Sequence, residues 1–199
     1  KNYGEIEGEN NVGGIEGVTS PDLLINKSIN FGKIEANSYV GGIVGGSLAA
    51  GYIVDCLNIG DIIAKENSAG GIMGYICNFK AITNCCNIGK IIGNNTVGGI
   101  IGNSYYIQNQ YNYTGRIVNC YNIGDLVAEK YVGEIVGAKT NYGTNYIENC
   151  YWREETGIDC ISTNISASAE VIISNSEPYT EEYMKTEDFL NKLNSYVQT

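Results

Sequence analysis

The chain has 199 residues, 26 of them Gly and 16 Tyr, with two Pro and no His. Its hydrophobic content of 43% predicts one sizeable folded domain rather than a disordered chain. A net charge of −10 excludes a basic surface for nucleic acid or for anionic membranes, so we expect neither partner.

The chain begins inside a repeated phrase. "NYGEIEG" opens at Asn2, and related phrases return as "INFGKIEA", "LNIGDIIA", "CNIGKIIG" and "YNIGDLVA". Spacings of 28, 28, 29 and 35 residues separate the glycines Gly4, Gly32, Gly60, Gly89 and Gly124. A constant period in this range predicts a solenoid. Because Lys1 falls in mid-repeat, we expect the chain to be part of a longer protein.

A second, glycine-rich phrase alternates with the first. It reads "NVGGIEG" over 11–17, "YVGGIVGG" over 39–46, "SAGGIMG" over 68–74, "TVGGIIG" over 96–102 and "YVGEIVG" over 131–137. A phosphate loop would occur once and end in Lys followed by Ser or Thr. The uncharged stretch 40–54 is too short to span a bilayer, so we expect no direct membrane insertion. We expect a structural role, at corners where backbones approach closely, for Gly42, Gly45, Gly71, Gly74, Gly99 and Gly102.

One full repeat, residues 53–75, contains three short apolar runs. They cover 53–57, 62–64 and 70–75, and these lengths suit strands rather than helices. A turn separates the first two runs, and we expect Gly60 to supply its positive φ. Three short strands per period predict an all-β chain folded as a parallel β-solenoid of about 28-residue coils. Crossover chirality favours a right-handed β-helix.

Stacked coils bring equivalent residues together. A single coil cannot bury its apolar side alone, so the core should consist of ladders that run along the axis. We expect four ladders: Ile53, Ile82, Ile117 and Ile147; Ile59, Ile88 and Ile123; Ile62, Ile91 and Leu126; and Ile43, Ile72, Ile100 and Ile135.

Seven cysteines are present, and one repeat position holds four of them: Cys56, Cys85, Cys120 and Cys150. A disulfide framework would suit a secreted protein. However, stacked parallel residues point the same way and fit a bridge poorly, and Ser28 takes this position in an earlier copy. We favour a column of buried free thiols. Cys86 should face the opposite way and, with Cys77, be more reactive; any pairing of these two or of Cys160 is left open.

Catalytic chemistry has few candidates. Without His, the hydrolytic triads, the H-E-x-x-H zinc site and a base for a catalytic Cys are missing. Paired carboxylates could hydrolyse glycosides, and the candidates at repeat positions are Asp55, Asp61, Asp125 and Glu148. Lys33 and Lys90 take the place of Asp61 and Asp125 in other copies, which favours a solvated turn. Calcium-loop and zinc spacings are also missing, so we expect no metal, no cofactor and no enzymatic activity.

The segment 103–115, "NSYYIQNQYNYTG", is the insertion that stretches one spacing to 35 residues. Insertions in solenoids become loops on one face and often carry function. Tyrosines among amides offer stacking surfaces and hydrogen bonds that suit sugars or proteins. The alternative is that they pack the loop against the solenoid wall. The candidate ligand-binding residues are Tyr105, Tyr106, Tyr111 and Tyr113.

The repeat pattern ends near residue 160, so we place the solenoid domain at 1–160. Within 161–199, a final strand or irregular segment precedes a helical stretch with acidic first turns after Thr180 and Thr186. Phe189, Leu190 and Leu193 form an apolar stripe on this helix. We expect the tail to cap the last coil and shield its unpaired edges; a linker to a further domain is the alternative.

Together the two phrases resemble the Glug repeat, whose signature places a hydrophobic pair between glycines. The signature reads Gly42-Ile43-Val44-Gly45 and recurs at 71–74 and 99–102, while Glu16 and Glu134 depart from it. The resemblance covers about residues 2–160. Such repeats occur in large secreted or surface-attached bacterial proteins, including adhesin-like proteins and non-catalytic regions of IgA-specific metallopeptidases. The resemblance implies an extracellular or bacterial cell-surface location and this architecture, but no single activity.

We therefore expect a non-enzymatic extracellular module that serves as a stalk or adhesive scaffold. One alternative is a module that binds a host glycan or protein through residues 103–115. The other is a carbohydrate-active β-helix enzyme that uses paired carboxylates.

Overall fold

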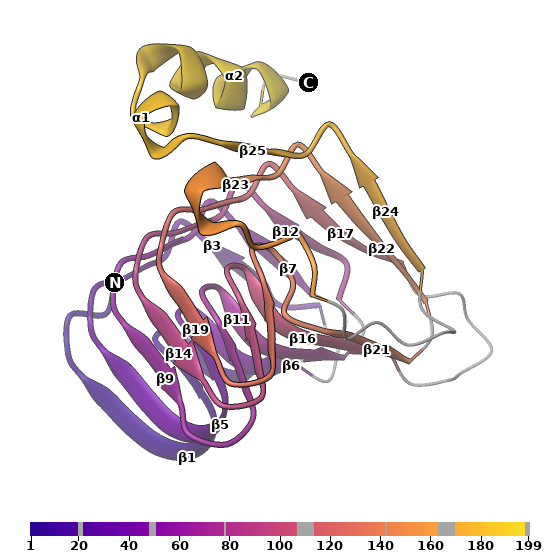
Figure 1. Ribbon diagram of the computed structural model, residues 1–199. Helices are drawn as coiled ribbons and strands as arrows, with labels where there is room; N and C mark the ends of the chain where they lie inside the picture. Colours follow the sequence, from indigo (N-terminus) through magenta and orange to yellow (C-terminus); the bar gives the residue numbers. More distant parts are fainter. Residues whose placement is uncertain are drawn as a thin grey trace.

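The structure, a computed structural model, describes residues 1–19, 22–47, 51–77, 79–106, 114–141, 143–162 and 170–197. Over these residues the chain winds into a β-solenoid of about 5 turns, about 29 residues apart. Four parallel sheets, here called A to D, run along the stack (Figure 1). The predicted all-β parallel solenoid is confirmed, and the hand of the coil stays a prediction.

Sheet A contains the shortest strands. They are β4 (Ile29–Asn30), β8 (Leu57–Asn58), β13 (Cys86–Asn87), β18 (Tyr121–Asn122), β23 (Tyr151–Arg153) and β25 (Glu177–Tyr179). The first four strands end in an Asn whose side chain is fully buried. Sheet A therefore presents a row of amides to the interior of the solenoid.

Sheet B follows sheet A along each coil and bends back on itself (Figure 1). Its strands are β1 (Ile6–Gly13), β5 (Ile34–Gly41), β9 (Ile62–Ala64), β10 (Ser68–Gly70), β14 (Ile91–Gly93), β15 (Thr96–Gly98), β19 (Leu126–Ala128) and β20 (Tyr131–Gly133). The predicted ladder from Ile62 through Ile91 to Leu126 lies here. Side chains from both arms of the bend, such as Ile62 and Ala69, form a small core of their own.

Sheet C comes next and runs against the second arm of sheet B. Its strands are β2 (Glu16–Thr19), β6 (Val44–Ser47), β11 (Met73–Cys77), β16 (Ile101–Tyr106) and β21 (Lys139–Asn141). The two layers are so close that a Cβ on Gly74 would lie 2.5 Å from the backbone nitrogen of Val40. On Gly41 it would lie 1.9 Å from the carbonyl oxygen of Val44. The predicted close approach of two backbones therefore explains why the glycine-rich phrase needs glycine at these positions.

Sheet D closes the coil. Its strands are β3 (Leu24–Asn26), β7 (Tyr52–Val54), β12 (Ala81–Thr83), β17 (Thr114–Val118), β22 (Thr144–Glu148) and β24 (Glu170–Ser174). Residue pairing confirms the predicted ladder Ile53, Ile82, Ile117 and Ile147. Ile25 extends this ladder toward the N-terminus.

The corner from sheet D to sheet A requires a left-handed residue in every turn. The φ angle is 54° at both Asp55 and Asn84, and it is also positive at the equivalent residues Asn119 and Asn149. The prediction that Gly60 supplies a positive φ was wrong. Gly60 is needed for space, because a Cβ there would lie 2.0 Å from the carbonyl oxygen of Gly32. Asn and Asp tolerate the left-handed region better than other residues that carry a Cβ.

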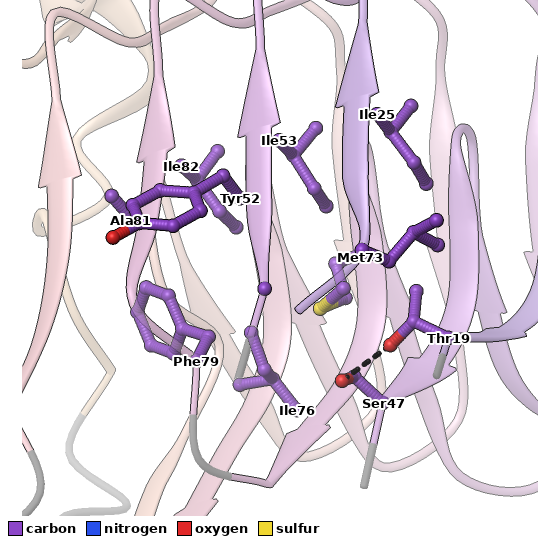
Figure 2. Close-up of a pocket in the computed structure, with 12 residues that line it drawn as sticks. Thr19, Ile25, Ser47, Tyr52, Ile53, Met73, Ile76, Phe79, Ala81 and Ile82 are labelled. Carbon is purple, nitrogen blue, oxygen red and sulfur yellow. Dashed lines mark hydrogen bonds between the residues drawn. The ribbon is translucent and has the colours of Figure 1, made fainter. Parts of the chain in front are cut away.

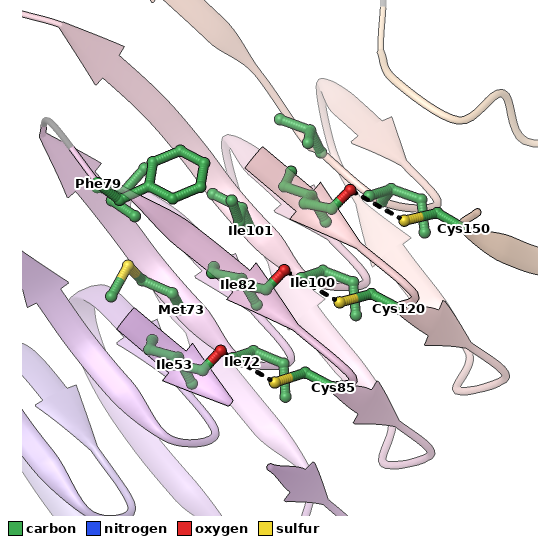
Figure 3. Packing of buried hydrophobic residues seen from close by; sticks show 14 of the residues in the cluster. Ile53, Ile72, Met73, Phe79, Ile82, Cys85, Ile100, Ile101, Cys120 and Cys150 are labelled. Atoms are coloured by element: carbon green, nitrogen blue, oxygen red, sulfur yellow. Dashed lines mark hydrogen bonds between the residues drawn. The ribbon is translucent and has the colours of Figure 1, made fainter. Parts of the chain in front are cut away.

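The main core lies between sheets A, C and D (Figure 3). The predicted ladder of Ile43, Ile72, Ile100 and Ile135 is confirmed, with all four side chains at 0% exposure. Ile59, Ile88 and Ile123 stack as predicted, but they point outward, and Ile88 is 39% exposed. The period identifies which residues stack, and the direction of each side chain depends on the local backbone.

The C-terminal segment adds two strands and then helices. β24 and β25 continue sheets D and A, and a short turn, η1 (Glu154–Thr156), lies before them. The predicted helical segment is present as α1 (Glu181–Met184) and α2 (Glu187–Val197), and Thr180 caps α1. Phe189 is 2% exposed and packs on Tyr121 and Tyr151, so α2 covers the outer face of sheet A (Figure 1). Leu190, predicted in the apolar stripe, is instead 54% exposed.

Within the ranges described, no helix has the length and apolar character needed to cross a bilayer.

Candidate functional site

The predicted tyrosine site begins at the end of β16. Tyr105 lies in this strand and is half-buried, and the strand ends at Tyr106. Tyr111 and Tyr113 lie outside the described residues. Of the four candidates, the contacts of Tyr105 are the ones that can be described.

Tyr105 belongs to a stack of three aromatic rings, here called the tyrosine stack. Its ring centroid lies 6.1 Å from that of Tyr75 in β11, with the planes inclined by 30°. The ring centroid of Tyr39 lies 4.8 Å from that of Tyr75, with the planes inclined by 48°. All three rings are half-buried, so part of each faces solvent.

The backbone explains why these rings meet. β11 and β16 pair with Tyr75 opposite Asn103, and Tyr105 lies two residues further along on the same face. Tyr39 has φ of 58°, a left-handed conformation that redirects its side chain out of the alternation of β5. The stack is therefore built from two sheets and would not follow from strand periodicity alone.

The tyrosine stack offers flat apolar faces with hydroxyl groups. Burial raises the pKa of Tyr75, so its phenol keeps its proton at neutral pH. A neutral phenol donates and accepts hydrogen bonds while its ring presents a surface for stacking. This combination suits the apolar face of a sugar or a side chain of a protein partner.

Sheet D carries a second aromatic surface on its outer side. Tyr52 is 43% exposed, and the Lys80 amine lies 5.3 Å from the centre of its ring. The Arg116 guanidinium lies 5.7 Å from the ring centre of Tyr146 and pairs with Glu148. The sequence signal that we missed is a Tyr one position before an inward-facing Ile in two different turns.

The carboxylates considered for glycoside hydrolysis are each held by a hydrogen-bond donor. The donors are Arg153 for Asp125, Arg116 for Glu148, Asn84 for Asp55 and the backbone N–H of Lys90 for Asp61. At 2.6 Å, the Arg153 guanidinium lowers the pKa of Asp125. A carboxylate held in this way already has a structural partner, so the described geometry does not favour it as a general acid.

The interior between sheets C and D holds a small cavity (Figure 2). Its volume is about 10 Å³, and Ile25, Ile53 and Met73 contribute to its wall. Thr19 and Ser47 close one side through a hydroxyl hydrogen bond of 2.6 Å. A cavity of about this size holds one water at most, so it does not serve a ligand.

The four predicted thiols belong to the main core beside sheet A, and Figure 3 shows Cys85, Cys120 and Cys150 in one file. Each Sγ contacts two backbone carbonyl oxygens: for Cys85 these are Thr83 at 3.2 Å and Ile53 at 3.7 Å. The expectation of buried free thiols is confirmed, because Cys56, Cys85, Cys120 and Cys150 are free and buried. Ser28 precedes the file, and Ser176, which we had not predicted, follows it in the same way.

A file of amides runs parallel to the thiols. Its members are Asn2, Asn30, Asn58, Asn87 and Asn122, and each Nδ2 donates to a glycine carbonyl of its own turn. The first four also donate to Oδ1 of the next Asn at 2.7 to 2.8 Å. We call this the asparagine file. Sequence analysis missed it, although Asn precedes the phrase glycine by two residues in every copy.

The asparagine file ends at a buried carboxylate. Asn122 Nδ2 donates to Glu134 Oε2 at 2.7 Å, and Glu134 is 0% exposed. Burial raises the pKa of Glu134, with the Asn122 bond acting in the opposite direction. Its Oε1 has no hydrogen-bond partner. Glu134 is therefore a buried carboxylate with one oxygen unpaired, which is costly for a charged group.

No family model, curated protein or solved structure matches the chain. The resemblance to the Glug repeat therefore stays a prediction that depends on the glycine phrases. The features of the described residues that bear on function are the row of thiols, the asparagine file and the two aromatic surfaces.

Two shallow grooves lie near the C-terminal end. One, of about 270 Å³, is lined by Tyr131, Val132 and residues of 157–162. The other, of about 240 Å³, lies between Tyr121 and residues of α2 that include Leu190. In the part of the chain that the structure describes, no cluster of three or more His, Cys, Asp or Glu side chains is placed to hold a metal ion.

Proposed function

We propose that the chain is a non-enzymatic structural module of a bacterial surface or secreted protein, and that it acts as a stalk or adhesive scaffold. The observation that carries this proposal is the asparagine file, which links each turn to the next from Asn2 to Glu134. The resemblance to the Glug repeat supports the location. The net charge of −10 supports solubility at a surface.

A stalk has to keep its length and resist being pulled apart. In this chain, neighbouring turns share backbone hydrogen bonds in four sheets as well as the two buried files of side chains. Buried amide networks in which each member is hydrogen-bonded rigidify a core and specify its register. Slippage of one turn against the next would break the bonds that both files make across that interface.

Pulling on the two ends of the chain tests the mechanical role. We expect the solenoid to resist and then to extend in steps of one turn, about 100 Å each for about 28 residues. The variant Asn58→Ala, Asn87→Ala should extend at lower force than the wild type. Extension without resistance, or an unchanged force in the variant, would contradict the proposal.

Surface labelling tests the location. Antibodies raised against the folded chain should label intact cells of the source organism, or detect the parent protein in the medium. A cytoplasmic protein serves as the control for leakage. Labelling that appears only after lysis would contradict an extracellular role.

The tyrosine stack favours binding of a glycan or a protein as a second candidate function. Its three half-buried rings come from two sheets and border the segment predicted as a binding loop. A glycan array, and a binding screen with surface proteins, should give a signal that the variant Tyr39→Ala, Tyr75→Ala, Tyr105→Ala loses. The variant Tyr52→Ala, Tyr146→Ala, on sheet D, is the matched control and should keep the signal. Equal signals from both variants would count against this site.

Carbohydrate cleavage, the other alternative, is tested by release of reducing ends from polysaccharides. Among the described residues, no observation favours it over the structural role.

A further inference from the structure

The file of four thiols has a geometry that the structural role does not use. Cys56 is 2% exposed, and Cys85, Cys120 and Cys150 are 0% exposed. They lie on successive turns and each donates to the carbonyl two residues earlier, so their sulfurs form a row parallel to the axis. Figure 3 shows Cys85, Cys120 and Cys150 of this row. The amides of Cys86, Tyr121 and Tyr151 donate to the carbonyls of Cys56, Cys85 and Cys120 in the neighbouring turn, so successive members of the row lie on adjacent hydrogen-bonded strands.

The spacing of the row is set by the sheet. Neighbouring strands lie about 4.8 Å apart, whereas a disulfide needs sulfurs about 2.05 Å apart. Two bonds of about 2.3 Å, the usual length between a metal and a thiolate sulfur, span about 4.6 Å when they lie end to end. Stacked thiols that point the same way fit a disulfide poorly, whereas a spacing of about 4.8 Å fits one ion bound linearly by two sulfurs.

The surroundings of the row favour a cation. Each sulfur contacts backbone carbonyl oxygens, as Cys120 does with Val118 at 3.3 Å and Ile82 at 3.6 Å. Cys150 contacts Glu148 at 3.4 Å and Ile117 at 3.5 Å in the same way. Carbonyl oxygens carry the negative end of the peptide dipole and stabilise positive charge. Thiol sulfur selects soft ions such as Cu(I) over Mg²⁺ or Ca²⁺.

We propose that the solenoid binds two soft monovalent metal ions of the Cu(I) class, one between Cys56 and Cys85 and one between Cys120 and Cys150. Each ion forms two bonds to sulfur and displaces one thiol proton, which leaves to the solvent. The second thiol of each pair keeps its proton on sulfur and still donates it to a carbonyl oxygen, so the bound pair is neutral. No electron is transferred. The central gap stays empty, because each sulfur is used once.

Serine at both ends of the row provides a clean way to test the site. Ser28 donates to the carbonyl of Asn26 at 3.3 Å, and Ser176 donates to that of Ser174 at 2.9 Å. These bonds repeat the one that each thiol makes to the residue two positions earlier. Replacement of Cys by Ser in the row therefore keeps the local hydrogen bond and removes the soft ligand.

The experiment uses Ag(I) in chloride-free buffer, added to the folded chain, followed by gel filtration and elemental analysis. We expect two ions per wild-type chain and about one proton released per ion. Cys56→Ser and Cys150→Ser should each bind one ion. Cys77→Ser, Cys86→Ser and Cys160→Ser, outside the row, should still bind two.

Two double variants decide whether adjacency matters. Cys56→Ser, Cys150→Ser leaves the neighbouring pair Cys85 and Cys120, and should bind one ion. Cys85→Ser, Cys120→Ser leaves two thiols that are not neighbours, and should bind none. Circular dichroism confirms that both are folded. Equal binding by the two variants, or no binding by the folded wild type, would overturn the proposal.

Discussion

The side-chain amide of Asn122 donates to the carboxylate of Glu134 over 2.7 Å. The asparagine file ends here because the next strand of sheet A carries Trp152 opposite Asn122. At the equivalent glycine of the previous turn, Gly99, a Cβ would lie 2.5 Å from Cγ of Asn122. Two departures from the repeat therefore compensate each other. Trp152 replaces the next Asn of the file, and Glu134, at the position of the repeat glycine, has a side chain that caps the file.

Removal of a central member of the asparagine file should be costly. Asn87 accepts from Asn58 at 2.7 Å and donates to Asn122 at 2.8 Å and to the carbonyl of Gly89 at 2.9 Å. Asn87→Ala leaves these buried groups short of partners, so we expect a loss of about 2–4 kcal/mol of stability. Urea denaturation measures it.

The matched control for this change is Asn2→Ala at the start of the file. Asn2 is half-buried and its bond to Gly4 is exposed, so water can replace what is lost. We expect a loss below about 1 kcal/mol. A similar loss in both variants would show that burial of the file does not determine its contribution.

Glu134 should make stability depend on pH. Its pKa is raised from 4.5 in the folded chain, chiefly by burial, so the folded state holds the proton more tightly than the unfolded state. This contribution is present below pH 4.5 and is lost as pH rises through the raised pKa. Glu134→Gln stays neutral and can still accept from Asn122. We expect equal melting temperatures at about pH 4 and a higher one for Glu134→Gln at neutral pH.

The control for the pH experiment is Glu9→Gln, which changes an exposed carboxylate. Its melting temperature should follow that of the wild type over the whole pH range. If the curves of wild type and Glu134→Gln run parallel, Glu134 does not carry the pH dependence.

The repeat period was sufficient to predict which residues stack. The registers of Ile53 with Ile82 and of Ile62 with Ile91 follow from spacing alone, because a parallel solenoid pairs each residue with its copy. The period could not reveal direction, which is why outward-facing Ile88 was assigned to a ladder. The bend in sheet B and its separate small core also left no signature in the spacing.

Side-chain chemistry was harder to predict than register. Asn58 precedes a glycine by two residues, a pattern that is typical of a turn, and its amide instead bonds along the axis to Asn87. The tyrosine stack depends on the left-handed φ of Tyr39, which the sequence gives no reason to expect for an aromatic residue. Both features arise from contacts between turns, and such contacts are fixed only when the coil is built.

Gly74, in the glycine-rich phrase, should not tolerate replacement by a residue with a side chain. In Gly74→Ala the new Cβ would lie 2.5 Å from the nitrogen of Val40 and 2.6 Å from the carbonyl carbon of Tyr39. Backbone on both sides cannot move without separating sheets B and C, so we expect a loss of about 3 kcal/mol or more, or failure to fold. Gly4→Ala is the control, since the atom nearest to its new Cβ, Oδ1 of Asn2, would be 3.8 Å away. Thermal melting should separate the two variants clearly, and equal melting would contradict the packing argument.

The thiols should be unreactive in the folded chain. Cys77 and Cys86 are 1% and 6% exposed, so the prediction that they are the reactive pair does not fit the structure. Burial also raises the pKa of Cys86, and the thiolate is the reactive form. We expect dithionitrobenzoate to titrate none of the seven thiols in the native chain within minutes and all seven in denaturant. Val127→Cys, at a position that is 47% exposed, should add one fast thiol. A native wild-type chain that reacts as fast as this variant would show that the wall of the solenoid opens widely enough to admit a reagent much bulkier than a metal ion.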